Sequence, residues 1–293
     1  MRMFQLIQCA ANTYYLKCFS NIGVYDLGDG TCVLIDSGDH KKSVSDLDKA
    51  IAAHGWRVRA LYNTHCHIDH ITGNRFFRDA YGCEIYAPHI ERFYVEESLL
   101  EPNYFYLGVP TNRGRNFFFR DIGTKSKELT PDVLPAGFEL LPLPGHCYNM
   151  VGIKTPDDVW FLGDAVVDPS TFDSYHLPLF YDINKSVATL RMLETLPGSC
   201  FVPSHTPATD NIAPLCRHNA KALLDNKAFV LARSDRKTFE EIFAAVTHDF
   251  GIELDMDKYA KLTFTVRIYL QALIEGGVLT ASLESGKLVY HRI

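Results

Sequence analysis

Apolar and polar residues alternate along the first part of the chain, from Phe4 to Asp36. The clearest break is GDG at 28–30, which joins GVYDL to TCVLID. Alternation with a period of two between glycine-containing turns predicts an antiparallel meander of three or four strands. Residues 40–54 carry apolar residues near helical spacing and end at Gly55, so this segment is predicted to be a helix.

Strand and helix patterns then alternate as far as residue 205. Strands are predicted at 59–64, 84–88, 138–145, 151–155, 159–164 and 200–205, and helices near 73–81 and 184–196. The repeated order of strands followed by helices in each half predicts an α/β protein. Its core would be two layers of sheet with helices outside.

The pattern changes after about residue 212. Helical periodicity covers 213–232, 238–250 and 257–275, and a short hairpin follows. We therefore predict a first domain over 1–212 and a helical domain over 213–293.

A long irregular segment interrupts the first half. Between Glu91 and Pro135 the periodicity is lost, and eight of the 36 aromatic residues of the chain fall within 27 residues of this segment. Such a segment is either a lid or pocket wall, or a long loop that its rings anchor to the body.

Composition and charge exclude several classes of protein. The 293 residues are 47% hydrophobic and 22% charged, with 14 Pro and 19 Gly, which is typical of a globular chain. The 35 Asp and Glu exceed the 29 Lys and Arg, giving a net charge of −6 that disfavours binding to nucleic acid or to anionic membranes. No apolar run approaches the ~20 residues that cross a bilayer.

The cysteines indicate a reducing compartment. Eight are scattered without a CxxC pair, and the first twenty residues lack the apolar core of a signal peptide. We therefore expect reduced thiols and a cytoplasmic location.

The strongest chemical signal is the run THCHIDH at 64–70, directly after a predicted strand. Its donors are His65, His67, Asp69 and His70. Their imidazole and carboxylate groups stand at two overlapping spacings, so one short loop can serve two adjacent metal ions.

Three further donors each follow a predicted strand, namely His146, Asp164 and His205. Strand ends at one edge of a sheet converge in space, so these side chains can join the same site. Imidazoles and carboxylates suit Zn²⁺ and also accept Fe or Mn. Two such ions would hold a bridging water, lower its pKa towards ~7 and thus supply hydroxide.

These motifs together resemble those of the metallo-β-lactamase superfamily. The five motifs are Asp36 in VLIDSG, THCHIDH, the pair Gly145-His146, Asp164 in FLGDA and His205 in PSHTP. The resemblance covers about residues 4–212. It implies a four-layer αββα sandwich and a hydrolase with two divalent ions, Zn²⁺ first.

The resemblance also implies a role for each residue. His65, His67 and His146 would hold one ion, and Asp69, His70 and His205 the other. Asp164 would bridge the two, and Asp36 would orient ligands from behind. Asp69 is also placed to orient the nucleophile or to receive its proton, as the catalytic residue.

Among the branches of the superfamily, the chain looks most like glyoxalase II and its relatives. We therefore expect hydroxide attack on a thioester, ester or lactone carbonyl of a small molecule. Two segments are expected to select it, 93–119 and 170–182. The candidate contacts are Arg113, Arg115, Tyr175 and His176.

The C-terminal block looks like the winged-helix-like tail of some superfamily members. A nuclease or phosphodiesterase is therefore the alternative function, and a metal-bound sensor that contacts a partner protein is a third. Residues 221–293 contain ten basic and ten acidic residues, however, which disfavours nucleic-acid binding. A packing or homodimerisation role is the better expectation.

Two cysteines adjoin the candidate ligands. Cys66 lies between two histidines and is expected to point away from the ions. Cys147 follows His146 in the run GHCYNMVG, where the family often has small residues. This departure concerns the shape of the pocket, and the thiols are otherwise expected to be structural.

Overall fold

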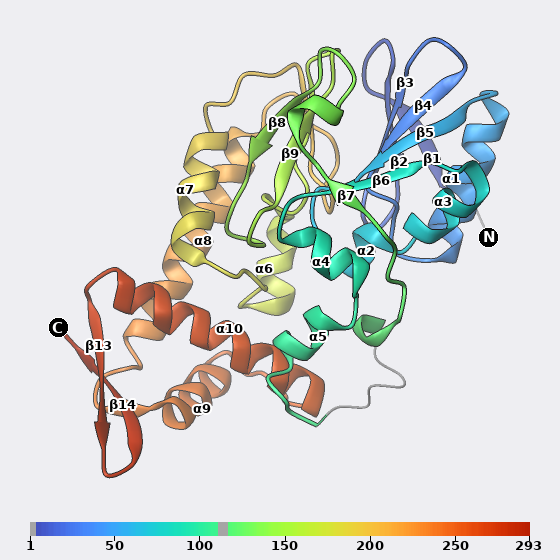
Figure 1. The fold of residues 1–293 in the computed structure, drawn as a ribbon. Helices are drawn as coiled ribbons and strands as arrows, with labels where there is room; N and C mark the ends of the chain where they lie inside the picture. The colour runs from blue at the N-terminus through green and yellow to red at the C-terminus, as the bar shows by residue number, and fades with distance from the viewer. Residues whose placement is uncertain (1–3, 111–116) are drawn as a thin grey trace.

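Two β-sheets form the centre of the molecule in a computed structural model that describes residues 4–110 and 117–293 (Figure 1). The first sheet has the order β1-β2-β3-β4-β5-β6-β7. Its strands are β1 (Gln5–Gln8), β2 (Thr13–Lys17), β3 (Ile22–Asp26), β4 (Thr31–Ile35), β5 (Arg57–Tyr62), β6 (Glu84–Ala87) and β7 (Lys127–Glu128). The first four are the predicted antiparallel meander, and β4 to β7 run parallel.

The second sheet has the order β11-β10-β9-β8. Its strands are β8 (Glu139–Pro142), β9 (Val151–Lys154), β10 (Val159–Phe161) and β11 (Cys200–Val202). Because β9 is antiparallel to both of its neighbours and β10 is parallel to β11, the strands β8, β10 and β11 run in one direction.

Alternation along the strands separates the layers. In β4, Cys32 and Leu34 face the helices α1 (Lys41–Ala53) and α3 (Asn74–Tyr81), whereas Val33 and Ile35 face the second sheet. Consecutive strand residues point to opposite faces, so one strand supplies both interfaces.

The second sheet is covered on its other side by helices. These are α6 (Pro169–Tyr175), α7 (Ile183–Leu193) and α8 (Ala213–Leu231). Trp160 of β10 belongs to the same buried cluster as Leu190 of α7 and Leu223 of α8. The four layers are thus helix, sheet, sheet and helix, as the sequence predicted (Figure 1).

The irregular segment contains more structure than its pattern indicates. It contains α4 (Glu91–Glu96), α5 (Leu100–Phe105) and the 3-10 turns η1 (Phe117–Phe119) and η2 (Pro131–Val133), and a further short helix, α2 (Ile68–Ile71), begins within the candidate ligand loop. Each is too short for helical periodicity to reveal it. Arg113 and Arg115 lie outside the described residues.

The C-terminal block has the three predicted helices and the hairpin. After α8 come α9 (Phe239–Asp249), α10 (Met256–Glu275), β13 (Leu279–Glu284) and β14 (Lys287–Arg292). An unpredicted strand of two residues, β12 (Lys237–Thr238), pairs with β14, so the small sheet has the order β12-β14-β13.

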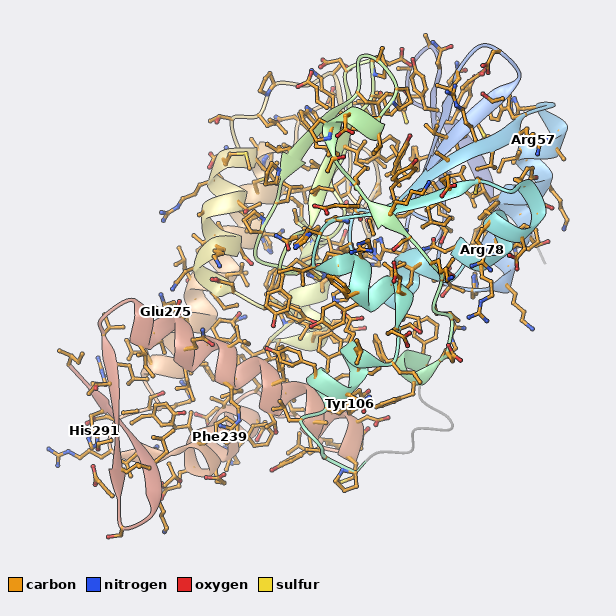
Figure 2. The ribbon with its side chains drawn as sticks, viewed as in Figure 1. Arg57, Arg78, Tyr106, Phe239, Glu275 and His291 are labelled. Atoms are coloured by element: carbon orange, nitrogen blue, oxygen red, sulfur yellow. The ribbon has the colours of Figure 1, made fainter. Side chains whose placement is uncertain are left out.

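The block packs against the rest of the molecule along α8 and α10. α10 contacts both α7 and α5, and the buried ring of Tyr106 lies at the end of α5 near it (Figure 2). One hydrophobic cluster runs from Phe105 to Tyr290 across the predicted boundary at 212. Within the described residues, none of the helices combines the length and the apolar character that crossing a bilayer requires.

Candidate metal centre

All the candidate ligands lie where strands end at one edge of the two sheets. Asp36 follows β4, and the loop that begins at Thr64 follows β5, its parallel neighbour. His146, Asp164 and His205 follow β8, β10 and β11, which share one direction. The topology therefore brings together donors that are up to 140 residues apart in the chain.

The donors form two compact groups. One contains His65, His67, His146 and Cys147, and the other contains Asp69, His70, Asp164 and His205. Within each group the candidate ligand atoms lie within 4.8 Å of one another. The structure thus brings all seven predicted ligands together and adds Cys147, which was not predicted to belong there.

The second group centres on Asp164. Its Oδ1 is 3.3 Å from His70 Nε2, and its Oδ2 is 3.2 Å from His205 Nε2. His205 Nε2 is also 3.2 Å from Asp69 Oδ2, which accepts a hydrogen bond from the Ser20 hydroxyl at 2.6 Å. Asp164 also reaches the other group, because its Oδ2 is 3.4 Å from His146 Nε2. It is therefore the carboxylate between the two groups.

A tight turn places His146. Gly145 has φ 131°, and its carbonyl accepts hydrogen bonds from the backbone N–H groups of Tyr181 and Asp182, at 2.9 Å each. A Cβ at Gly145 would lie 2.3 Å from Ser186 Oγ, so only glycine fits between the ligand loop and α7. His146 Nε2 consequently lies 2.8 Å from His67 Nδ1.

Asp36 holds the ligand loop from behind. Its carboxylate accepts hydrogen bonds from Thr64 N and Thr64 Oγ1, at 2.8 Å each, and lies 2.9 Å from His70 Nδ1. A proton on His70 Nδ1 leaves Nε2 free to face Asp164. This is the orienting arrangement that the resemblance implied for Asp36.

Glu101 of α5 occupies the corresponding position behind His67. Its Oε1 is 3.0 Å from His67 Nε2, accepts a hydrogen bond from the Tyr181 hydroxyl at 3.2 Å, and is 4% exposed as a residue. Glu101 was not predicted, because the interpretation of the segment 91–135 was based on its aromatic residues. Glu101 stands at no characteristic distance in sequence from the histidine motif. Its occurrence in an aromatic-rich irregular segment was the only feature of the sequence that could have indicated a role.

The charges of the two groups depend on one another. Burial raises the pKa values of Asp69 and Asp164, but His70 and His205 outweigh it and hold both carboxyl pKa values below their usual range. For His205, burial lowers the pKa and Asp164 raises it more, to about 10. Burial, reinforced by His67, lowers the pKa of His146 to about 3. Without a cation, the protons of His70 and His205 therefore balance the carboxylates.

The donor set fits divalent metal ions. His65 Nε2, His70 Nε2 and Asp164 Oδ1 are buried and form no hydrogen bond among the described residues. Leaving such atoms unpaired costs free energy, which coordination would recover. Bonds of about 2.1 Å to a tetrahedral ion separate its ligands by about 3.4 Å, close to the spacings observed around Asp164.

The predicted substrate residues lie in different surroundings. Tyr175, at the end of α6, is 64% exposed, and the ring of His176 stacks on Phe250 with centroids 4.9 Å apart. In the segment 170–182, the last aromatic residues contact the candidate metal ligands, whereas Tyr175 and His176 have the surroundings just described. Phe180 packs against His146 at 5.5 Å, and Tyr181 against His67 at 6.3 Å.

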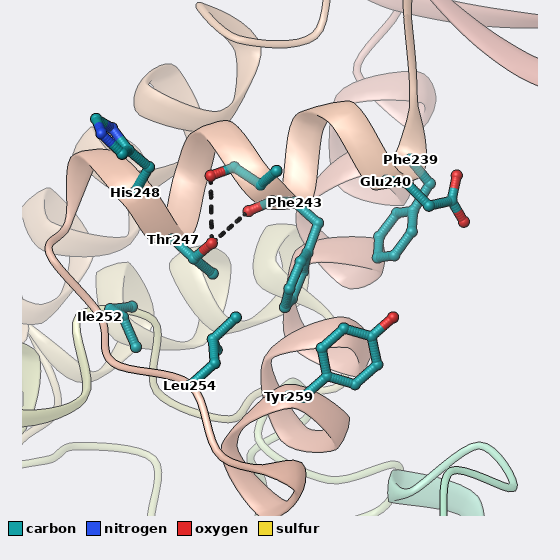
Figure 3. Close-up of a pocket in the computed structure, with 9 residues that line it drawn as sticks. Phe239, Glu240, Phe243, Thr247, His248, Ile252, Leu254 and Tyr259 are labelled. Atoms are coloured by element: carbon teal, nitrogen blue, oxygen red, sulfur yellow. Dashed lines mark hydrogen bonds between the residues drawn. The ribbon is translucent and has the colours of Figure 1, made fainter.

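A separate hollow of about 420 Å³ lies in the C-terminal block, between α9 and the start of α10 (Figure 3). Rings of Phe239, Phe243 and Tyr259 line it, together with the aliphatic Ile252 and Leu254. None of the candidate ligands lines it. The hollow is therefore distinct from the metal centre.

Comparisons with known proteins identify a family and several relatives. Residues 15–205 match the family model described as metallo-beta-lactamase superfamily. A hydroxyacylglutathione hydrolase from Hyphomonas neptunium is 32% identical over 144 residues, which is 49% of this chain and 46% of that protein. A hydroxyacylglutathione hydrolase from Brucella anthropi is 24% identical over 230 residues, 75% of each chain.

Solved structures resemble the whole molecule. A beta-lactamase domain protein from Burkholderia ambifaria has a TM-score of 0.74 at 15% identity, covering 99% of this chain and 94% of its own. A metallo-beta-lactamase family protein from Thermus thermophilus has a TM-score of 0.66 at 16% identity, covering 100% and 98%. At these identities the likeness concerns the fold.

Proposed function

The chain belongs to the metallo-β-lactamase superfamily, and from this premise we propose that it is a metal-dependent hydrolase of small thioesters, esters or lactones. The observation that carries the proposal is the convergence of seven His and Asp side chains into two adjacent groups that share Asp164. Buried ligand atoms without hydrogen bonds in both groups support it.

The curated relatives favour thioesters among these substrates. Several are named hydroxyacylglutathione hydrolase, although the matches to the first of them span less than half of each relative. A hydroxyacylglutathione is a thioester with a polar carrier. We therefore place thioesters first and keep esters and lactones as alternatives.

We assign the metal ligands as follows. His65, His67 and His146 would hold one ion, Asp69, His70 and His205 the second, and Asp164 would lie between them. Zn²⁺ is the expected metal, and the nitrogen and oxygen donors also accept Fe or Mn. When bound, such a pair supplies Lewis acidity that activates water and polarises a carbonyl.

Residues of the chain itself orient the metal ligands and can accept a proton from water. Asp36 and Glu101 each take one ring nitrogen of a histidine, so that the other nitrogen faces the centre. Asp69 is fixed through Oδ2 by Ser20 and His205, and its other oxygen, Oδ1, can accept a proton from an attacking water. Because Asp69 is the most solvent-accessible carboxylate of the centre, it is also our candidate catalytic residue.

An aromatic wall beside His67 defines where an acyl group would lie. Phe105 of α5 packs at 5.9 Å from His67, and Tyr181 packs on Phe105 at 5.7 Å. Phe264 of α10 contacts both rings, at 5.7 and 5.6 Å. The C-terminal block thus contributes to the wall, and we propose that this wall excludes water around the acyl group.

A role of the C-terminal block in homodimerisation stays a prediction.

A hydrolysis screen tests the proposed function. Full-length protein, freed of metal and then loaded separately with Zn²⁺, Mn²⁺ or Fe²⁺, is assayed on thioesters, lactones, simple esters and phosphodiesters. We expect metal-dependent turnover of at least one carbonyl substrate and its loss in Asp164→Asn. The matched control Asp79→Asn changes an exposed carboxylate that pairs with Arg78, and it should retain activity.

Two results would contradict the proposal. One is less than one metal ion per chain in protein prepared without chelator. The other is turnover of phosphodiesters alone, which would favour the nuclease. The equal numbers of basic and acidic residues in 221–293 give that alternative no support.

A further inference from the structure

A second cluster of metal-binding side chains lies on the far side of His67. Cys66, Glu91 and Cys147 are all buried, and a sulfur or carboxylate oxygen of each lies within 4.8 Å of those of the other two. They come from three segments, namely the loop after β5, the first residue of α4 and the loop after β8. Three distant parts of the chain therefore meet here.

The cluster is distinct from the three-histidine group. His67 presents Nδ1 to His146 Nε2, at 2.8 Å, whereas Cys147 Sγ lies 3.4 Å from the opposite nitrogen, Nε2. An ion bound between His67 and His146 therefore lies on one edge of the imidazole ring, and Cys147 lies by the other edge. The thiol of Cys147 is thus better placed to join Cys66 and Glu91.

A buried carboxylate oxygen without a hydrogen-bond partner points to a cation in this cluster. Glu91 is 0% exposed, and its Oε1 accepts a hydrogen bond from the Asn149 backbone N–H at 3.0 Å. Its Oε2 is buried and has no hydrogen-bond partner among the described residues. Glu101, 4% exposed, adds a second carboxylate nearby, 3.4 Å from Cys66 Sγ. Buried carboxylates are normally paired or coordinate a metal.

We propose that Cys66, Cys147 and Glu91 form a third metal site, separate from the two predicted ions, with Glu101 as the fourth ligand. Two thiolates and a carboxylate select a borderline or soft divalent ion such as Zn²⁺ over Mg²⁺ or Ca²⁺. Bonds of about 2.3 Å to sulfur and 2.1 Å to oxygen separate tetrahedral ligands by roughly 3.4–3.8 Å. The ligand atoms of Cys66, Glu91 and Cys147, which lie within 4.8 Å of one another, therefore need to close by at most about 1.4 Å.

An ion here would be structural. It would tie α4 and α5 to the two loops that carry His65, His67 and His146, and it would neutralise carboxylates that the fold otherwise buries together. Glu101 would then connect this ion to His67 Nε2, at 3.0 Å. The site has no open position for a substrate, because all four ligands are buried.

Cobalt titration of the full-length chain tests the third site. Metal is removed under a phosphine reductant and Co²⁺ is added, because thiolate ligation gives near-ultraviolet charge-transfer absorption that His and Asp ligands do not give. We expect this absorption in the unmodified chain and its loss in Cys66→Ser and in Cys147→Ser. Cys83→Ser, a buried thiol packed behind the first sheet, is the matched control and should keep it.

Glu91→Gln and Asp164→Asn separate this proposal from the proposed function. Glu91→Gln should weaken cobalt binding at the thiolate site about 10-fold or more while leaving hydrolysis measurable, whereas Asp164→Asn should abolish hydrolysis and keep the thiolate absorption. If the chain is no hydrolase, the absorption is still expected.

Three results would overturn the third site. The first is no thiolate absorption at saturating Co²⁺. The second is absorption lost in Cys147→Ser but unchanged in Cys66→Ser, which would assign Cys147 to the three-histidine group. The third requires no variant: X-ray absorption of the zinc-loaded unmodified chain that shows no sulfur scatterers around any ion.

Discussion

Asp36 shows how a single residue organises the centre. It has φ 62°, a left-handed backbone that is uncommon for residues other than glycine but tolerated by Asp. This turn directs the carboxylate back to Thr64 and His70. The motif VLIDSG thus ends a strand and supplies the group that sets the tautomer of a ligand.

Replacing Asp36 by Asn should therefore weaken metal binding. Asn keeps the shape and can still accept from Thr64, but it loses the charge that favours a proton on His70 Nδ1. We expect a 10- to 100-fold lower affinity for Zn²⁺, measured by competition with a chromophoric chelator. Asp79→Asn serves as the control, and an unchanged affinity in Asp36→Asn would contradict the orienting role.

Metal loading should also release protons. Because carboxylates raise the pKa of His205 to about 10, this ring is protonated at neutral pH in the metal-free chain, whereas a ligand must be neutral. Affinity should rise with pH until about 10. His146, with a pKa of about 3, is already neutral and releases nothing.

Calorimetry of Zn²⁺ binding in two buffers of different ionisation enthalpy counts these protons. At about pH 7.5, His205→Ala should release about one proton fewer than the unmodified chain. His89→Ala, which changes a side chain that is 63% exposed, should release the same number. An equal count in His205→Ala would refute the assignment.

At the scale of elements, α10 forms part of the wall beside the centre. Phe264, 3% exposed, packs its ring against Tyr104, Phe105 and Tyr181. This helix lies about 200 residues after the histidine motif, so the contact depends on the packing of α10 against α5. The periodicity of 257–275 predicted the helix but not its neighbour.

Phe264→Ala should destabilise the protein and disturb the wall. Removing a buried phenylalanine costs about 3–5 kcal/mol of unfolding free energy, because burial is lost and a cavity remains. Urea unfolding measures this, and Phe76→Ala, at a ring that is 40% exposed, should cost much less. If Phe264 forms the acyl pocket, KM for the best substrate should also rise. A cost below about 1 kcal/mol would show that the ring does not hold α10 in place.

At the scale of the whole molecule, the C-terminal block shares its core with the second sheet. Asn219 of α8 receives a hydrogen bond from Val167 N and donates one to Val167 O, both at 2.9 Å. Cys216 and Leu223, one turn on either side, belong to the same buried cluster as Leu190 of α7. The proposed division at 212 thus coincides with the start of α8, although the core continues across it.

A chain ended after Ile212 should therefore fold poorly. It would expose the face of α7 that α8 covers and leave Val167 N without its acceptor. We expect loss of the cooperative urea transition, followed by circular dichroism, and binding of a hydrophobic dye. A cooperative transition in the truncated chain would instead support two independently folding domains.

Strong periodicity or a spaced motif made much of the molecule predictable. The meander, the long helices and the αββα layers are confirmed, since each depends on local alternation or on strand order. The short elements α4, α5 and β12 were missed because two to six residues contain too little of any period. Glu101 was missed because its role depends on the position of α5 and not on its neighbours in the chain.

By itself, the sequence determined which residue types are available and roughly where the meander, the other main strands and the long helices lie. It also placed His65, His67, Asp69 and His70 on one loop, because four donors within six residues cannot separate. Only the tertiary structure decided which nitrogen of each ring faces the centre. Only the tertiary structure brought Glu91, Glu101 and Cys147 together near His67, on the side of the ring away from His146. Hydrogen-bond direction and burial arise from segments that meet in space, and no local pattern encodes those meetings.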